Sequence, residues 1–350
     1  MKNLNILLID GLSRSGLAVA RGIKAQSRHR LHAVVSHAGR MNGLRNRLRS
    51  APFDKIHFSS SGFWEPSFID ELENILAGTI IDAVIPISQA AAVAVSKSKP
   101  RLEKYSRILI EDFDKVMEIN KKIRTITIAR KTGIAHPKTL VPDNLDEVRS
   151  YAEKTTCPVV IKARRGSGGH GLRYAWTSRE IVPVYQAVSD LSRHDDGLIN
   201  DRKNPLIQEY IPGEIHDALI YAVDGSVLTG LTQKRIATRP ESGGFGIVNI
   251  TTRNPLLMEY AGRIAKHTGW NGVFMAEFKI RRPGDEPVLL EVNPRFWGTT
   301  WLSIKAGVNF PHYLVSDAFG TPVDYPQDYR EGLVCRWIMD EIGGIKTYQP

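Results

Sequence analysis

Cysteine is nearly absent from this chain of 350 residues, which contains only Cys157 and Cys335. Two cysteines cannot build a disulfide framework and, by themselves, cannot form a zinc site. Long hydrophobic runs are also missing, because apolar stretches such as residues 80–87 are interrupted by an aspartate and a proline. The apolar segment before Asp10 is too short for the core of a signal peptide. We therefore expect a cytoplasmic protein without a membrane partner.

Acidic residues are fewer than basic ones, which gives the chain a formal net charge of +10. Basic residues gather in residues 40–49 and 97–107, a pattern compatible with a nucleic-acid partner. Neither run is interleaved with aromatic side chains in the way that single-strand binders require. The alternative is a basic surface together with a site for small polyanions. We favour this alternative and expect no nucleic-acid partner.

The first hundred residues alternate predicted strands with predicted helices. The predicted strands are residues 4–9, 32–36 and 80–87, with a helix at 15–24. This alternation predicts a parallel sheet covered on both faces, a Rossmann-like domain over residues 1–110. The turn at residues 11–16 lacks both the lysine of a phosphate loop and the middle glycine of a dinucleotide motif. We interpret it as a tight strand-to-helix turn.

The remaining chain is predicted to be α+β, divided into residues 111–205 and 206–350. A helix is predicted from Glu111 to about Thr132, with Gly133 ending it. The polar segment 186–206 is predicted to be a solvated loop or a lid, and a strand-rich pattern follows it.

Two glutamates provide the strongest chemical signal in the sequence. Two alternating segments, residues 273–280 and 287–294, flank a turn that we centre on Gly284. Glu277 and Glu291 are each seven residues from that glycine, and therefore face each other across the predicted hairpin. Like charges directly opposite destabilise a sheet unless one is protonated or a cation lies between them. Asn293 is on the same face as Glu291 because strand side chains alternate.

Two carboxylates and an amide are oxygen ligands that suit Mg²⁺. The alternative is an ordinary sheet surface, with ion pairs to Lys279 or Arg295. In the first interpretation Arg295 lies just beyond the metal ligands, where a guanidinium can hold phosphate oxygens or charge that develops during transfer.

A lysine and a glycine-rich turn predict a phosphate site. Lys162 ends a β-branched segment, and Gly168 and Gly169 belong to the turn that follows, where backbone amides can close over phosphates. A plain hairpin is the alternative.

Residues 206–216 are predicted to form a slot for adenine. Main-chain groups around Glu209 and Ile211 would contact the ring edge, with Glu214 or His216 near the ribose. Glu209, Glu214 and His216 could instead be exposed polar groups. The same alternative holds for Lys122, on the helix predicted before Gly133.

In order and spacing these motifs resemble the ATP-grasp superfamily, of the carboxylate–amine ligase type and similar to the branch of carbamoyl-phosphate synthase large chains and biotin carboxylases. The matching positions are Lys122 before Gly133, Lys162, the hinge Gln208–Glu209–Tyr210–Ile211, and Glu277, Glu291, Asn293 and Arg295. Gln208 stands where several relatives carry an acid. The resemblance implies a Rossmann-like pre-ATP-grasp domain followed by a two-subdomain ATP-grasp fold.

The resemblance also implies cofactors and a reaction. ATP would lie between the two subdomains, on Lys122, Lys162 and the hinge, with Mg²⁺ (or Mn²⁺) on Glu277, Glu291 and Asn293. A small-molecule carboxylic acid would attack the γ-phosphate to form an acylphosphate, and an amine would displace phosphate. The candidate catalytic residues are Arg295, Lys234 and Arg235, and the candidate substrate-binding residues are Arg239 and Gly243. A homodimer is compatible with this class.

Other functions stay open at this stage. A kinase on the same fold, or a phosphorylation like that of carbamoyl-phosphate synthase, would release the phosphorylated product instead of coupling it to an amine. A non-catalytic nucleotide-binding module is disfavoured because it has no need for a facing pair of carboxylates. A nicotinamide dehydrogenase is disfavoured because no acidic residue follows the first turn by some twenty positions.

Overall fold

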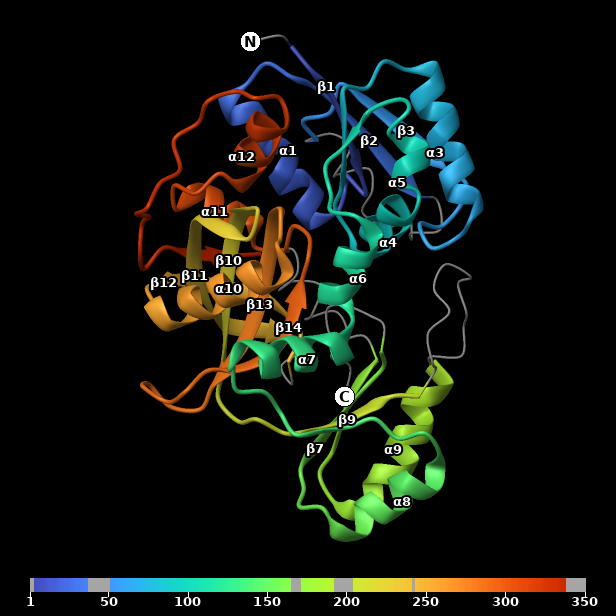
Figure 1. The fold of residues 1–350 in the computed structure, drawn as a ribbon, viewed down its shortest axis with the longest axis vertical. Coiled ribbons are helices and arrows are strands. Elements are labelled where there is room, and N and C mark those ends of the chain that lie inside the picture. Colours follow the sequence, from blue (N-terminus) through green and yellow to red (C-terminus); the bar gives the residue numbers. More distant parts are fainter. Residues whose placement is uncertain (1–2, 37–50, 165–170, 192–203, 241–242, 338–350) are drawn as a thin grey trace, which may run out of the picture.

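The computed structural model describes residues 3–36, 51–164, 171–191, 204–240 and 243–337. These residues form three sheets, of five, six and four strands. In Figure 1 the five-stranded sheet is at the top, the six-stranded sheet in the middle and the four-stranded sheet at the bottom. No helix among the described residues is long and apolar enough to span a membrane. The predicted combination of a parallel sheet with mixed α+β parts is confirmed.

The N-terminal sheet is parallel throughout, with strand order β3-β2-β1-β4-β5. Its strands are β1 (Asn5–Ile9), β2 (Arg30–Ser36), β3 (Lys55–Ser59), β4 (Ala83–Pro86) and β5 (Arg107–Ile108). The helices are α1 (Arg14–Gln26), α3 (Ser67–Gly78), α4 (Gln89–Lys97) and α5 (Lys99–Leu102). The strand predicted at 80–87 is shorter in the structure, where β4 begins at Ala83. Ile80 is exposed, and the Asp82 carboxylate accepts a hydrogen bond from the Asn5 backbone at the start of β1.

The helix predicted from Glu111 to Thr132 is in fact two helices. They are α6 (Phe113–Asn120) and α7 (Lys122–Thr132), separated by Lys121 in an extended conformation. The break lets both helices pack apolar side chains into one core beneath the six-stranded sheet. Gly133 ends α7 in the left-handed conformation, as the sequence predicted. The break places Lys122 at the first turn of α7, and this position directs it to the site described below.

The four-stranded sheet has the order β6-β9-β7-β8. It contains β6 (Thr139–Leu140), β7 (Val159–Lys162), β8 (Leu172–Ala175) and β9 (Leu206–Glu209), and α8 (Leu145–Lys154) and α9 (Ser178–Leu191) pack against it. The prediction of a loop or lid over residues 186–206 is wrong for residues 186–191, which continue α9 because Val188 is buried against the sheet. Residues 192–203 lie outside the described part of the chain.

The six-stranded sheet is antiparallel, with order β14-β13-β10-β11-β12-β15. Its strands are β10 (Glu214–Val223), β11 (Ser226–Arg239), β12 (Phe245–Thr252), β13 (Gly272–Ile280), β14 (Val288–Asn293) and β15 (Val334–Arg336). One face packs against α6, α7 and α10 (Pro255–Thr268). The other face shares a core with α1 and α12 (Phe310–Ala318), and α11 (Thr300–Lys305) also contacts α1. The predicted boundaries at residues 110 and 205 stay predictions.

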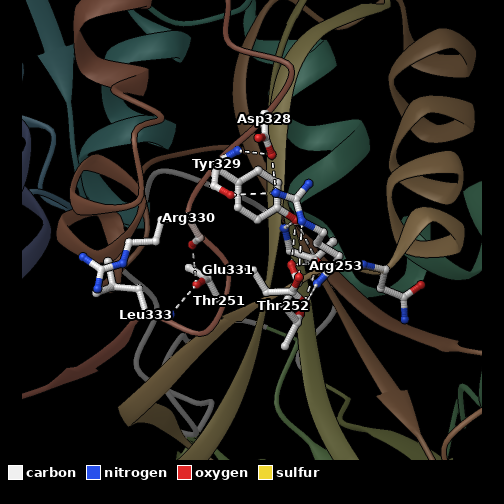
Figure 2. A network of polar contacts seen from close by, with 10 residues as sticks. Thr251, Thr252, Arg253, Asp328, Tyr329, Arg330, Glu331 and Leu333 are labelled. Atoms are coloured by element: carbon white, nitrogen blue, oxygen red, sulfur yellow. Dashed lines mark hydrogen bonds and ion pairs between the residues drawn. The ribbon is translucent and has the colours of Figure 1, made fainter.

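A polar network ties the segment before β15 to the end of β12 (Figure 2). Arg253 donates to the Asp328 carboxylate and, at 2.8 Å, to the Tyr329 carbonyl. Thr251 donates to the Arg330 carbonyl at 2.8 Å and accepts from the backbone of Leu333 at 2.9 Å. These contacts fix the segment before β15 against the end of β12. The other end of β12 begins at the loop that borders the cavity described below.

Candidate functional site

A cavity of about 280 Å³ lies between the four-stranded and six-stranded sheets. Most of the predicted site residues line it, although they come from distant parts of the sequence. Those that line it are Lys122, Lys162, Gln208, Glu209, Tyr210, Ile211, Arg235, Gly243, Glu277, Glu291, Asn293 and Arg295. The fold thus brings the two lysines, the hinge and the acidic hairpin together.

Three predicted residues lie on the opposite face of the six-stranded sheet. Glu214, His216 and Lys234 alternate with the cavity-lining positions of β10 and β11, and the Lys234 ammonium pairs with the Glu214 carboxylate at 2.6 Å. Strand alternation therefore directs them away from the cavity. Arg239 is not part of the lining either. Gly168 and Gly169 lie outside the described residues.

The facing pair of glutamates is present as predicted. Glu277 of β13 is the register partner of Glu291 of β14. The register shifts directly after this pair, with Phe278 opposite Leu289, so that Leu290 is the extra residue of a β-bulge. Asn293 also lines the cavity, and its Nδ2 donates to Glu291 Oε1 at 3.1 Å.

Arg235 joins the acidic pair to a third carboxylate that the sequence analysis missed. Its Nη2 donates to Asp217 Oδ1 at 2.7 Å and also to Glu277 Oε2, while Nη1 donates to the Gly244 carbonyl at 3.0 Å. Asp217 is fully buried and also accepts from Gln233 at 2.7 Å. The available signal was an aspartate directly before the apolar residues 218–223.

Burial and charge act in opposite directions on this cluster. Burial raises the pKa of Glu277 above its usual value, although the Arg235 guanidinium opposes this effect. Burial also disfavours ionisation of Glu291, but the ammonium groups of Lys122 and Lys162 outweigh it and lower the pKa of Glu291. Burial lowers the pKa of both lysines, with the Glu291 charge opposing it. The cavity therefore contains positive and negative groups that are only partly solvated. A charged ligand that binds there can shift their pKa values.

The loop after β14 presents hydrogen-bond donors that no other described residue uses. Arg295 donates through Nη1 to the Phe296 carbonyl at 3.0 Å and through Nη2 to Asn293 Oδ1 at 3.4 Å. Within the described residues, the buried Arg295 Nε, Trp297 Nε1 and Thr299 Oγ1 have no hydrogen-bond partner. All three residues line the cavity, so this end of it suits a ligand with acceptor oxygens.

The lining also contains apolar side chains that suit a planar ring. Val160, Ile211 and Leu290 contribute them. Gln208 is buried, and its Nε2 donates to Thr139 Oγ1 at 3.0 Å. Its Oε1 has no partner within the described residues and can accept from a ligand N–H.

Arg14, the first residue of α1, reaches the site, which no sequence signal indicated. Its Nε donates to the Gly298 carbonyl at 2.7 Å, and its Nη2 donates to the Gly246 carbonyl at 2.8 Å. It thereby connects α1 to the loop after β14 and to the start of β12, both in the cavity wall. Tyr174 of β8, also missed, lines the cavity from the four-stranded sheet.

The donor set fits Mg²⁺ better than a softer metal. Within the described part of the chain, no group of three or more His, Cys, Asp or Glu side chains could hold a metal ion. Two carboxylates and the amide oxygen of Asn293 form a partial set of oxygen ligands. Mg²⁺ is bound in this way, by one or two carboxylates together with water and phosphate oxygens.

Two protein-family models match the chain over ranges that overlap at residues 202–211. Residues 117–211 match the ATP-binding domain of the carbamoyl-phosphate synthase large chain, and residues 202–341 match an ATP-grasp family of "the biosynthetic pathway with Ter operon". The carbamoyl phosphate synthase large chain of Pyrococcus furiosus is 25% identical over 247 residues, which are 68% of this chain and 20% of that relative. The chain thus spans about a fifth of the length of that relative.

Solved structures share the fold at low sequence identity. The L-amino acid ligase of Bacillus licheniformis has a TM-score of 0.75 at 14% identity, covering 95% of this chain and 80% of that one. The biotin carboxylase domain of the 2-oxoglutarate carboxylase of Hydrogenobacter thermophilus, solved with MgADP and bicarbonate, has a TM-score of 0.75 at 16% identity, covering 95% and 74%. The matched family ranges run together from residue 117 to residue 341 and contain both lysines and the acidic hairpin. The chain belongs to the ATP-grasp superfamily.

Proposed function

We propose that this protein is an ATP- and Mg²⁺-dependent ligase that couples a small carboxylic acid to an amine, with release of ADP and phosphate. The observation that carries the proposal is the facing pair Glu277 and Glu291, in one cavity with Lys122, Lys162 and the unused donors of the loop after β14. The names of the relatives, which include an L-amino acid ligase, a biotin carboxylase domain and a carbamoyl phosphate synthase, support the same reaction class.

The cavity suggests an orientation for ATP. The adenine ring fits beside the apolar lining residues, where its amino group can donate to Gln208 Oε1, which is otherwise without a partner among the described residues. Lys122 and Lys162 are placed to neutralise phosphate oxygens. Glu277, Glu291 and Asn293 would hold Mg²⁺, or Mn²⁺ in its place. When bound, the metal would neutralise charge on the transferring phosphoryl group.

The proposed reaction has two steps that need no covalent enzyme group. A carboxylate oxygen of the acid forms a bond to the γ-phosphorus while the bond to the ADP oxygen breaks. The amine nitrogen then forms a bond to the acyl carbon, phosphate leaves, and the amine loses a proton. Arg295 stabilises the negative charge on the acid and phosphate, and Arg235 keeps Glu277 in place. Catalysis comes mainly from positioning and charge neutralisation.

Release of the phosphorylated acid is the second candidate, favoured by the match to the ATP-binding domain of carbamoyl-phosphate synthase. Pools of small acids, with and without pools of amines, are incubated with ATP and Mg²⁺, and phosphate release is measured. The ligase predicts release that requires both an acid and an amine. A stable phosphorylated acid that forms without amine would support the second candidate, and no acid-dependent consumption of ATP would contradict both.

Lys162→Ala is expected to raise the dissociation constant of ATP about tenfold or more. A hydrogen bond to a charged group is worth about 1.5–3 kcal/mol, and the alanine variant loses it. Titration calorimetry with a non-hydrolysable ATP analogue measures the effect. The matched control is Lys154→Ala, an exposed lysine in the last turn of α8, which should bind the nucleotide as the unchanged protein does. An unchanged affinity in Lys162→Ala would remove this lysine from the phosphate site.

A further inference from the structure

A second cavity, of about 390 Å³, lies where the N-terminal sheet meets the six-stranded sheet. Its wall includes Ile85 and Pro86 at the carboxyl end of β4, Val223 at the end of β10, and Ala318 at the end of α12. β4 lies beside β1 in the sheet, and the connections lead away from these two strands in opposite directions. Ligands of open parallel sheets bind at such switch points, outside the carboxyl ends of the strands.

Arg295 lies between the two cavities, because it is part of the lining of both. The negative charges of Glu291 and of Asp10, which follows β1, also act on its guanidinium. A ligand group at Arg295 therefore lies at the border between the reaction site and the second cavity.

The polar atoms of the second cavity indicate what kind of ligand it takes. Two buried donors of its lining, Arg295 Nε and Trp270 Nε1, have no hydrogen-bond partner within the described residues.

The charged side chains of the lining other than Arg295 already form hydrogen bonds within the protein. Asp317 accepts from two tyrosines, Glu111 from Lys115 and Asn271, and Lys99 donates to Asp112 at 2.7 Å. The unused groups are N–H donors, so they suit acceptor oxygens and not an ammonium group.

The rest of the wall is mainly apolar, with side chains such as Ile110, Val273 and Leu314. A cavity of this size, with an apolar wall and a few directed polar groups, is typical of a small-molecule site. We propose that the acid substrate carries an extended apolar group, which occupies this second cavity while Arg295 holds its carboxylate. This inference rests on the proposed ligase function and specifies its substrate class.

The test is a binding series of straight-chain carboxylates, from acetate to octanoate, measured by calorimetry with ADP and Mg²⁺ present. Burial of one methylene is worth about 0.8 kcal/mol, so the dissociation constant should fall about fourfold for each added carbon until the cavity is full. Straight-chain amines of the same lengths should show no such series. Equal affinity for all acids, or a chain-length dependence for the amines instead, would overturn the proposal.

Two variants with larger side chains in the wall of the second cavity test whether the alkyl chain binds there. Ala318→Phe and, independently, Val223→Phe should weaken octanoate binding at least tenfold and leave acetate and ADP binding unchanged. Ala77→Phe, on the exposed side of α3, adds the same ring away from both cavities and should change nothing. If the wall variants fold and octanoate still binds as in the unchanged protein, the acid does not use this cavity.

A parallel assay separates this inference from the proposed function. Hydroxylamine, as a general amine, traps acylphosphates as hydroxamates, which are measured for the same acids with ATP and Mg²⁺. Hydroxamate formation that is independent of chain length would overturn the cavity proposal while the ligase function stands. Binding that depends on chain length, without hydroxamate or phosphate from any of the acids that bind, would overturn the ligase function and support the cavity only as a binding site.

Discussion

Glu291→Gln is expected to lower the rate of ATP turnover about 10³-fold or more and to leave the fold intact. The substitution keeps the shape of the side chain but removes one of the two facing negative charges, and with it a ligand that Mg²⁺ needs. Loss of one preorganised electrostatic group typically costs about 10²–10³ in kcat, and loss of a metal ligand adds to that. ADP formation at saturating ATP and Mg²⁺ measures the effect, and circular dichroism measures the fold.

The hairpin itself offers a matched control for this variant. Glu286 is exposed in the turn between β13 and β14, where its carboxylate accepts from the Tyr260 hydroxyl at 3.2 Å. Glu286→Gln makes the same chemical change at a residue outside the cavity lining, and its turnover should equal that of the unchanged protein. Turnover close to the unchanged value in Glu291→Gln would contradict the metal assignment.

Arg235→Met is expected to lower the free energy of unfolding by about 3–5 kcal/mol in the absence of ligands. Its guanidinium pairs with both Asp217 and Glu277, and its side chain is only 8% exposed. Removing one partner of a buried ion pair leaves uncompensated charge in a poorly solvated place, with a cost of this size. Urea denaturation measures the change, and ATP turnover should fall as well because Glu277 loses its positioning contact.

A combined variant tests whether the loss of stability comes from the unpaired carboxylates. Arg235→Met together with Asp217→Asn and Glu277→Gln removes the unpaired carboxylates and should recover most of the lost stability. Arg149→Met breaks an exposed pair with Asp146 on α8 and should not change stability measurably. If Arg235→Met is as stable as the unchanged protein, or if the combined variant is less stable than the single one, the charge explanation is wrong.

Local patterns predicted the parts of the site that lie on a single hairpin. The seven-residue spacing around Gly284 predicted that Glu277 faces Glu291, and the register agrees. The agreement depends on a bulge at Leu290, because the pairing next to the turn is shifted by one residue. Counting residues from a turn cannot reveal such a shift, since a bulge depends on twist and packing in the whole sheet.

Local patterns failed where the position of a side chain depends on a distant element. Glu214 and His216 were expected near the ribose, but the face of β10 that meets the cavity carries Asp217 instead. The sequence predicted one continuous helix around Lys121, but the chain forms two helices there. Both pack under the large sheet, and local sequence does not reveal that this packing requires a break.

The sequence by itself determined the alternation of strands and helices at the N-terminus, the acidic hairpin with its amide, and the resemblance to ATP-grasp proteins. These features depend on spacings of a few residues, which strand and turn geometry convert directly into structure. Only the tertiary structure decided that Arg235 joins Asp217 to Glu277, that Arg14 reaches the cavity from α1, and that Arg295 lines two cavities. Such contacts join residues far apart in the chain, and their geometry is set by how whole sheets pack against each other.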